Sequence, residues 1–276
     1  MRTEPSRPAF DLDRFQDLAR RAELTPGRCE WPAELGSTNA ELADRLTAEP
    51  DGWPDLSVLG TDHQTAGRGR LDRVWTVPPA ACLTFSVPFR VPAAFPAEML
   101  GWLPVVTGWC VAEALAERGA PAGVKWPNDV LVDGRKICGI LTRAHLDPER
   151  GTTVIIGIGI NVSLTAGELP VPTATSLTLA GGSADREALL VGVLSRLGPA
   201  VAEVLRAGPR AGATAPAGGV RDAMITLGSD VRVELPGDER FTGRAVELDA
   251  TAALVVEVDG ERRRVSAGDV VHARPA

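Results

Sequence analysis

A change of composition near residue 207 divides the chain into two parts with different patterns. Residues 207–219, AGPRAGATAPAGG, consist mostly of alanine, glycine and proline. Before this segment, apolar spacings typical of helices alternate with runs typical of strands, whereas residues 224–274 hold only short strand-like runs. The sequence therefore predicts an α+β part, a linker near 207–219 and a small β-barrel.

The first part contains strong signals for both kinds of element. We expect strands within 55–64, 82–91, 123–146 and 152–162, and helices over 38–48, 103–118 and 185–206. Residues 1–30 are expected to form a short N-terminal arm with one helix around 10–24. That length is too short for a helix-turn-helix domain.

Charge and composition argue against several classes of protein. Lys and Arg number 29 and Asp and Glu number 36, and the net charge of −7 lacks the basic footprint of nucleic-acid binding. The sequence shows neither a secretory signal nor an apolar run long enough for a membrane span. The four cysteines are scattered as in a reduced cytosolic protein, and the three histidines do not suggest a zinc site. We expect a cytoplasmic protein that binds neither nucleic acid nor membranes.

One basic segment stands out in this acidic chain. Residues 64–75 read QTAGRGRLDRVW and place three arginines, Arg68, Arg70 and Arg73, beside two glycines. Glycine lets backbone amides approach a ligand closely, and arginine matches phosphate and carboxylate oxygens. The segment lacks the GK[ST] of a Walker A loop and the third glycine of a dinucleotide-binding fingerprint. It is therefore either a solvated loop or a loop that binds an anion.

A second segment, KWPNDV at residues 125–130, places a lysine and an aspartate on either side of a turn. Pro127 excludes a helix and favours an extended residue before it, so we expect a strand that ends in a turn. Lys125 can neutralise phosphate charge and Asp129 can hold Mg²⁺, although Asn and Asp are also ordinary turn residues. Lys136, which follows an Asp-Gly turn, either faces an anion or extends from a buried run into solvent.

Two further stretches allow both a structural and a functional interpretation. Residues 157–161, GIGIN, place two glycines inside an apolar strand, which indicates close approach by a ligand or by another backbone. Asn161 either reads an adenine edge or caps a turn. Ser37, Thr38 and Asn39 either cap the helix that follows or hydrogen-bond a buried polar ligand.

In this combination and order, these segments resemble a bacterial biotin–protein ligase of the type without a DNA-binding domain. The resemblance runs over residues 37–162 through STN, QTAGRGR, Trp75, KWPND, Lys136 with Gly139, and GIGIN. It implies an α+β catalytic domain at residues 31–219, in which helices flank a mixed β-sheet as in biotin and lipoate ligases. It further implies an SH3-like β-barrel at residues 220–276.

The resemblance also assigns residues to ligands. Lys136, Arg68 and Lys125 are implied as catalytic, with Lys136 near the biotin carboxylate and the reacting phosphoryl group. The residues implied around biotin are Ser37, Thr38, Asn39, Gln64, Gly67, Arg68, Gly69, Arg70, Lys136 and Gly139. The residues implied on the ATP side are Arg68, Arg70, Arg73, Trp75, Lys125, Asn128, Asp129 and Asn161, and Asp129 is also the implied magnesium ligand.

The implied reaction uses biotin, ATP and Mg²⁺ and needs no protein nucleophile. Biotin is first activated as biotinoyl-5′-AMP and then transferred to a lysine of a biotin carboxyl carrier protein. The sequence departs from the family at Leu71-Asp72, where many members have a glycine, and Asp72 adds a negative charge to the arginine segment. A lipoate or octanoate ligase or transferase of the same fold is the alternative, and either a monomer or a homodimer is expected.

Overall fold

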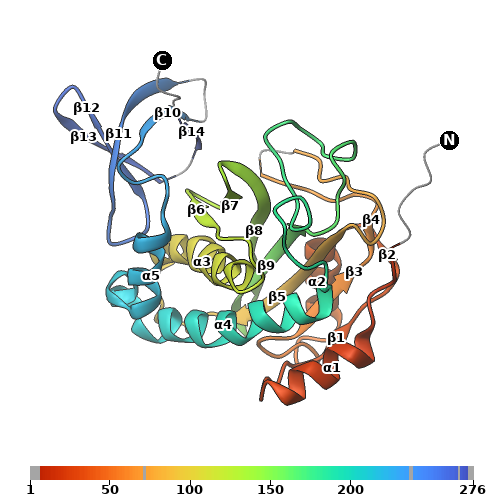
Figure 1. The fold of residues 1–276 in the computed structure, drawn as a ribbon. Coiled ribbons are helices and arrows are strands. Elements are labelled where there is room, and N and C mark those ends of the chain that lie inside the picture. Colours follow the sequence, from red (N-terminus) through yellow and green to blue (C-terminus); the bar gives the residue numbers. More distant parts are fainter. Residues whose placement is uncertain (1–6, 71–72, 236–238, 267, 273–276) are drawn as a thin grey trace.

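The chain is built around a seven-stranded sheet (Figure 1), and the computed structural model describes residues 7–70, 73–235, 239–266 and 268–272. The strands of this sheet are β1 (Cys29–Glu30), β3 (Val58–Thr61), β5 (Cys82–Arg90), β6 (Gly123–Lys125), β7 (Asp129–Val132), β8 (Arg135–Asp147) and β9 (Gly151–Asn161). They lie in the order β1-β3-β5-β9-β8-β7-β6. β1 and β3 pair in parallel and the other neighbours pair antiparallel, which confirms the mixed sheet.

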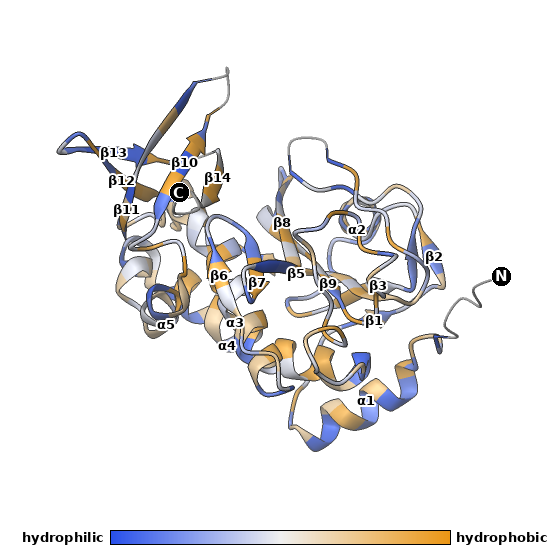
Figure 2. Cartoon of the chain, turned by 45° about the horizontal axis from the view of Figure 1, so that its top comes forward, coloured by the Kyte–Doolittle hydropathy of each residue, from blue (hydrophilic) through white to orange (hydrophobic). Residues whose placement is uncertain are grey.

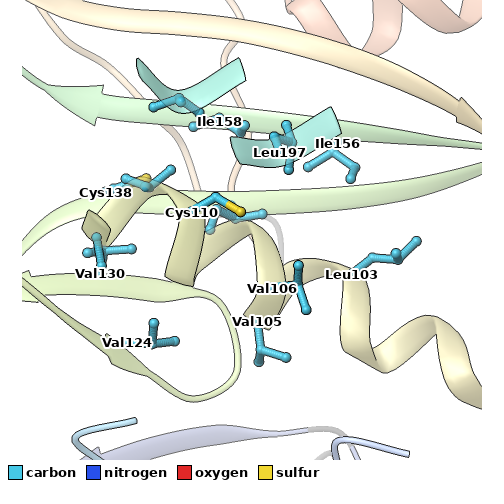
Figure 3. Close-up of a cluster of buried hydrophobic side chains, with 14 of the residues drawn as sticks. Leu103, Val105, Val106, Cys110, Val124, Val130, Cys138, Ile156, Ile158 and Leu197 are labelled. Atoms are coloured by element: carbon cyan, nitrogen blue, oxygen red, sulfur yellow. The ribbon is translucent and has the colours of Figure 1, made fainter. Parts of the chain in front are cut away.

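Helices cover both faces of this sheet. The helices are α1 (Leu12–Arg21), α2 (Thr38–Ala48), η1 (Ala97–Gly101), α3 (Trp102–Ala116), α4 (Arg186–Ala207), η2 (Gly208–Ala213) and α5 (Ala215–Ala223). Successive side chains of a strand point to opposite faces. In β9, Ile156 and Ile158 therefore join the core formed with α3 and α4, whereas Ile155 packs with α2. Figure 3 shows this core, with Ile156 and Ile158 beside Leu197 of α4.

The hairpin of β7 and β8 has the turn that the sequence predicts. β7 ends at Val132, and β8 begins at Arg135. The two residues between them, Asp133 and Gly134, have φ values of 49° and 71°. Positive φ at both central positions is what a tight two-residue hairpin turn requires. The turn thus sets where Lys136 enters β8.

The last part of the chain is a five-stranded antiparallel sheet, consistent with the expected small barrel-like domain. Its strands are β10 (Asp230–Glu234), β11 (Arg240–Leu248), β12 (Leu254–Val258), β13 (Glu261–Val265) and β14 (Asp269–His272). They lie in the order β13-β12-β11-β10-β14. Trp102 Nε1 donates to Ala250 O at 2.8 Å, and Trp126 Nε1 donates to Ala252 O at 2.9 Å. These bonds attach the β11–β12 turn to the larger part, and the domain bounds stay a prediction.

The segment that we predicted to be a linker, 207–219, is folded. It forms η2 and the first half of α5, and Thr214 caps α5 by accepting a hydrogen bond from Ala217 N at 3.3 Å. A Cβ on Gly219 would lie 2.5 Å from the ring of Trp109 in α3. The small residues of this segment therefore permit close helix packing, and the linker interpretation was wrong.

The N-terminal region also belongs to the folded body. α1 confirms the helix expected around 10–24, and it buries Phe15 and Ala19 against the core. Figure 2 shows hydrophilic and hydrophobic residues in turn along this helix. Two helical stretches, Ala97–Ala116 and Arg186–Ala213, are long and apolar enough to cross a membrane by length and composition. In the most apolar 18 residues of each stretch, 67% and 56% of the residues are buried inside the molecule, as in the core helices of other proteins.

Candidate active site

The face of β9 turned away from α3 and α4 carries two glycines. A Cβ on Gly157 would lie 2.6 Å from the side chain of Asn39. A Cβ on Gly159 would lie 2.9 Å from the indole ring of Trp75. Gly139 of β8 pairs with Gly159, so the two strands form a flat surface under that ring. The glycines of GIGIN therefore permit the close approach of two side chains that the resemblance assigns to biotin and ATP.

The N-terminus of α2 lies over this face of the sheet and is capped by another segment. Ser37 occupies the N-cap position, but its side chain makes no capping hydrogen bond. Instead, Gln64 Oε1 accepts a hydrogen bond from Thr38 N at 2.8 Å and lies 3.2 Å from Thr38 Oγ1. Gln64 belongs to β4 (His63–Gln64), which pairs in parallel with β2 (Glu34–Leu35). Gln64 thus caps α2 in place of residues 37–39, and two predicted residues, Gln64 and Thr38, lie together.

Ser86 of β5 joins this polar group, although the sequence did not single it out. Its Oγ lies 2.8 Å from both Thr38 Oγ1 and Asn39 Oδ1. Asn39 Nδ2 donates to Leu141 O at 2.9 Å, and all the side chains of the group are buried. The signal was present, because large apolar residues alternate with small polar ones along β5. Alternation places the polar ones on the face away from the core.

Lys125, Asp129 and Lys136 converge at the edge of the sheet. Lys125 ends β6 and pairs with Asp129, which begins β7. Lys136 Nζ lies 2.6 Å from Asp129 Oδ1. The aliphatic end of Lys136 lies beside Gly139, where a Cβ would stand 3.3 Å from Cε. Lys136 thus points to a carboxylate rather than into open solvent.

Burial and the charges of this cluster both act on the pKa of Lys125. Burial lowers the pKa of Lys125, Asp129 opposes this shift, and the charges of Lys136 and Arg73 lower the pKa further. Among the described residues, the cations Lys125, Lys136 and Arg73 therefore act on one region beside the carboxylate of Asp129. Such a region favours an anionic ligand, because the ligand's charge relieves the repulsion between like charges.

The arginine segment forms a narrow loop that begins at the glycine surface. Trp75 N donates to Gly67 O at 2.9 Å, and Gly69 N donates to Arg73 O at 2.7 Å. A Cβ on Gly67 would lie 2.5 Å from Trp75 O, so this glycine lets the two sides of the loop meet. The departure from the family at residues 71–72 lies outside the described residues.

Two arginines of the loop have defined positions relative to other predicted segments. Arg68 pairs with Val74 in an isolated antiparallel bridge. Arg70 donates to Asn128 Oδ1 at 3.2 Å and to Gly268 O at 3.1 Å. Burial lowers the pKa of Arg70, while the carboxylate of Asp129 raises it. Arg70 therefore connects the loop to the KWPND turn and to the C-terminal sheet.

Trp75 and Asn161 lie farther along the same face. In the described part of the chain, Trp75 Nε1 is buried and has no hydrogen-bond partner. Asn161 is 3% exposed, its Nδ2 donates to Thr175 O at 2.9 Å, and its Oδ1 lies 3.5 Å from the thiol of Cys82. Asn161 thus holds residue 175 against β9, and its contact with adenine stays a prediction.

A cleft of about 450 Å³ is lined by residues of both the KWPND turn and the C-terminal part of the chain. Arg70 and Asn128 line it on one side, and Thr251 and Arg264 line it on the other. Arg264 Nε lies 2.6 Å from Asp249, so its charge is paired within the C-terminal sheet. The cleft borders the predicted site through Arg70 and Asn128.

The described residues offer neither a preformed metal cage nor an activated thiol. No group of three or more His, Cys, Asp or Glu side chains converges among them. Burial raises the pKa of Cys82 and Cys110 to about 12 and that of Cys29 to about 11. These thiols are therefore protonated at neutral pH and unsuited to nucleophilic chemistry.

Comparisons with known proteins agree with this arrangement. The Biotin/lipoate A/B protein ligase family matches residues 36–161, and the Biotin protein ligase C terminal domain matches residues 226–273. A biotin–[acetyl-CoA-carboxylase] ligase of Mycobacterium tuberculosis is 38% identical over 273 residues, which is 97% of each chain. The bifunctional ligase/repressor BirA of Salmonella typhimurium is 31% identical over 95% of this chain and 78% of its own length.

A solved structure extends the likeness to three dimensions. The biotin protein ligase from Aquifex aeolicus in complex with biotin and ATP has a TM-score of 0.73 and 29% sequence identity. The match covers 90% of this chain and 99% of that one. The structural similarity thus covers both parts of the molecule, and so does the sequence similarity to the ligase of M. tuberculosis. The chain belongs to the biotin–protein ligase family.

Proposed function

We propose that this chain is an ATP-dependent biotin–protein ligase, which activates biotin as biotinoyl-5′-AMP and transfers it to a lysine of a biotin carboxyl carrier protein. The observation that carries the proposal is the convergence of Lys125, Lys136 and Asp129 beside the glycine surface of β8 and β9. The names of the relatives support the same substrates, since the A. aeolicus ligase was solved with biotin and ATP.

In the first step, an oxygen of the biotin carboxylate forms a bond to the α-phosphorus of ATP, and the bond to pyrophosphate breaks. Two anions must approach each other, so the chain has to neutralise charge and fix their positions. Lys125 and Lys136 supply fixed positive charge, and Arg68 and Arg70 supply more from the loop. As the anions bind, Lys136 exchanges its contact with Asp129 for contacts with their oxygens.

In the second step, the neutral amine of an acceptor lysine attacks the carbonyl carbon of the mixed anhydride. The bond from that carbon to the phosphate oxygen breaks, AMP leaves, and the amine loses a proton. No protein nucleophile takes part, which agrees with the protonated state of the cysteines. We place this reaction in the cytoplasm, with a monomer or a homodimer as the active form.

Magnesium fits this site as a partner of the nucleotide. Asp129 is the carboxylate of the cluster, and Mg²⁺ commonly binds one or two carboxylates together with substrate phosphates. Lys125, Lys136 and Arg70 interact with Asp129, and their charges disfavour a metal ion there before ATP has entered. When bound, the ion would neutralise charge on the phosphates, and Asp129 would be its protein ligand.

The proposal is tested by biotin-dependent exchange between ATP and pyrophosphate. The wild-type protein is compared with Lys136→Ala and with Arg135→Ala, which removes an exposed cation from the preceding position of β8. We expect exchange in wild type and in Arg135→Ala, and a loss of about 100-fold or more in Lys136→Ala. Exchange that requires lipoate or octanoate rather than biotin would establish the alternative, and no exchange with any of these acids would refute ligase activity.

A further inference from the structure

A buried ion pair lies next to the candidate site, outside every motif considered above. Asp62 stands between β3 and β4, and Arg186 is the first residue of α4. Arg186 Nη1 lies 2.7 Å from Asp62 Oδ1, and the two side chains are 5% and 11% exposed. An ion pair buried this far destabilises a fold unless further hydrogen bonds satisfy both groups.

Pro8 and Phe10 of the N-terminal segment supply two of the groups that bond this pair. Phe10 N lies 3.2 Å from Asp62 Oδ2, and Arg186 Nη2 donates to Pro8 O at 2.8 Å. Trp31 Nε1 lies 3.3 Å from Asp62 Oδ1. The rings of Phe10 and Trp31 are stacked, with centroids 3.7 Å apart. The segment thus covers the pair and keeps it from water.

The pair is connected to the candidate site by a short stretch of backbone. Asp62 precedes Gln64 by two residues, and the side chain of Gln64 caps α2. The carbonyl of Asp62 accepts a hydrogen bond from Ala80 N at 2.8 Å, and Arg186 Nη1 reaches Cys82 O at 3.4 Å. The β3–β4 turn is therefore bonded both to α4, through Arg186, and to Ala80 in the segment that precedes β5.

We propose that Asp62 and Arg186 are positioning residues for the biotin end of the site. The pair fixes the β3–β4 turn, and the turn fixes the amide of Gln64 against the N-terminus of α2. The proposal rests on the proposed function, because the resemblance assigns Gln64 to biotin. Neither residue belongs to the cluster around Lys136, so the effect is specific to one substrate.

A second ion pair provides a matched control. Arg14 of α1 lies 2.7 Å from Glu187 Oε2 and also contacts Asp185, and its side chain is 44% exposed. These contacts attach the same N-terminal region to the same end of α4. They do not involve Asp62 or the β3–β4 turn. Loss of Arg14 therefore tests whether mere attachment of the N-terminal region accounts for any effect.

The experiment measures the KM values for biotin and ATP in the exchange reaction for Asp62→Asn, Trp31→Phe and Arg14→Gln. We expect Asp62→Asn to raise the KM for biotin about 10-fold while the KM for ATP stays within about two-fold. Trp31→Phe keeps an aromatic ring and removes one donor to Asp62, so we expect the KM for biotin to rise about three-fold. Arg14→Gln is expected to leave both values unchanged.

The outcomes separate the two proposals. A KM for biotin that is unchanged in Asp62→Asn, or that rises equally with the KM for ATP, would show that the pair has only a structural role. Should Asp62→Asn fail to fold, Trp31→Phe decides by the same comparison. Absence of biotin-dependent exchange in the wild-type protein would instead overturn the proposed function and this proposal together.

Discussion

At the scale of single residues, the site depends on where side chains are missing as much as on where charges lie. The sequence predicted that the glycines of GIGIN permit a close approach. It could not show that side chains of this chain, Asn39 and Trp75, make that approach. Gly157 lies on β9 and Asn39 on α2, and a local sequence pattern cannot predict a contact between residues so far apart in the chain.

Gly157→Ala is expected to weaken biotin binding. The new Cβ would stand 2.6 Å from Asn39, which must move and give up its hydrogen bond to Leu141 O. We expect the KM for biotin to rise about 10-fold in steady-state exchange. Gly192→Ala in α4 is the control, because its Cβ meets the nearest atom at 3.6 Å. An equal KM for biotin in Gly157→Ala and Gly192→Ala would contradict the close contact between Gly157 and Asn39.

Lys125 is expected to limit activity at alkaline pH. Burial lowers its pKa from the ordinary value of 10.5. The charged form binds anions, so its contribution is complete below the pKa in the folded protein and is lost as the pH rises through it. In a pH profile of the exchange rate, the decline at alkaline pH should therefore begin below the ordinary pKa of lysine. Arginine stays charged, so Lys125→Arg should move this decline to higher pH. Identical pH profiles for the wild-type protein and Lys125→Arg would refute the role of Lys125.

At the scale of elements, patterns of period and turn predicted most of the fold. The Asp133-Gly134 turn, the strands of the hairpin and the long helices follow from local chemistry. Local chemistry did not predict the structure of the segment 207–219, because alanine and glycine suit both a flexible linker and closely packed helices. The close packing of Gly219 against Trp109 and the capping of α5 by Thr214 distinguish the two.

Two neighbouring glycines of α5 are expected to respond in opposite ways to alanine. A Cβ on Gly218 meets nothing within 4 Å, so Gly218→Ala should stabilise the protein by about 0.5–1 kcal/mol through helix propensity. A Cβ on Gly219 would overlap the ring of Trp109, so Gly219→Ala should destabilise it by about 1–3 kcal/mol. Urea unfolding measures both, and a shift of the same sign in the two variants would disprove the packing of α5 on α3.

At the scale of the whole molecule, the two sheets meet through side chains that local sequence does not connect. Trp126 is 3% exposed, and its backbone N donates to Thr226 Oγ1 at 3.0 Å. The order of the motifs predicted the family and the kind of fold. It did not predict the pairing of Asp62 with Arg186, because 124 residues separate them and neither lies in a motif.

Trp126→Phe tests how tightly the C-terminal sheet is attached. The change keeps an aromatic ring and removes the donor to Ala252 O, which leaves a buried carbonyl unpaired. We expect the free energy of unfolding to fall by about 1–3 kcal/mol. Fluorescence and circular dichroism should still report a single transition. Two separate transitions in the wild-type protein would show that the sheets unfold independently.

The contact between Lys136 and Asp129 has a consequence for the crowded ionic medium of a cell. An isolated ammonium group would collect chloride, free phosphate and other bystander anions, each of which would obstruct the substrates. Because Lys136 already has a tethered counterion 2.6 Å away, an incoming anion must displace a carboxylate of the protein itself. We expect a ligand that several groups hold at once to displace this carboxylate more readily than a small solitary ion would, so that the site favours its substrates over abundant bystander anions.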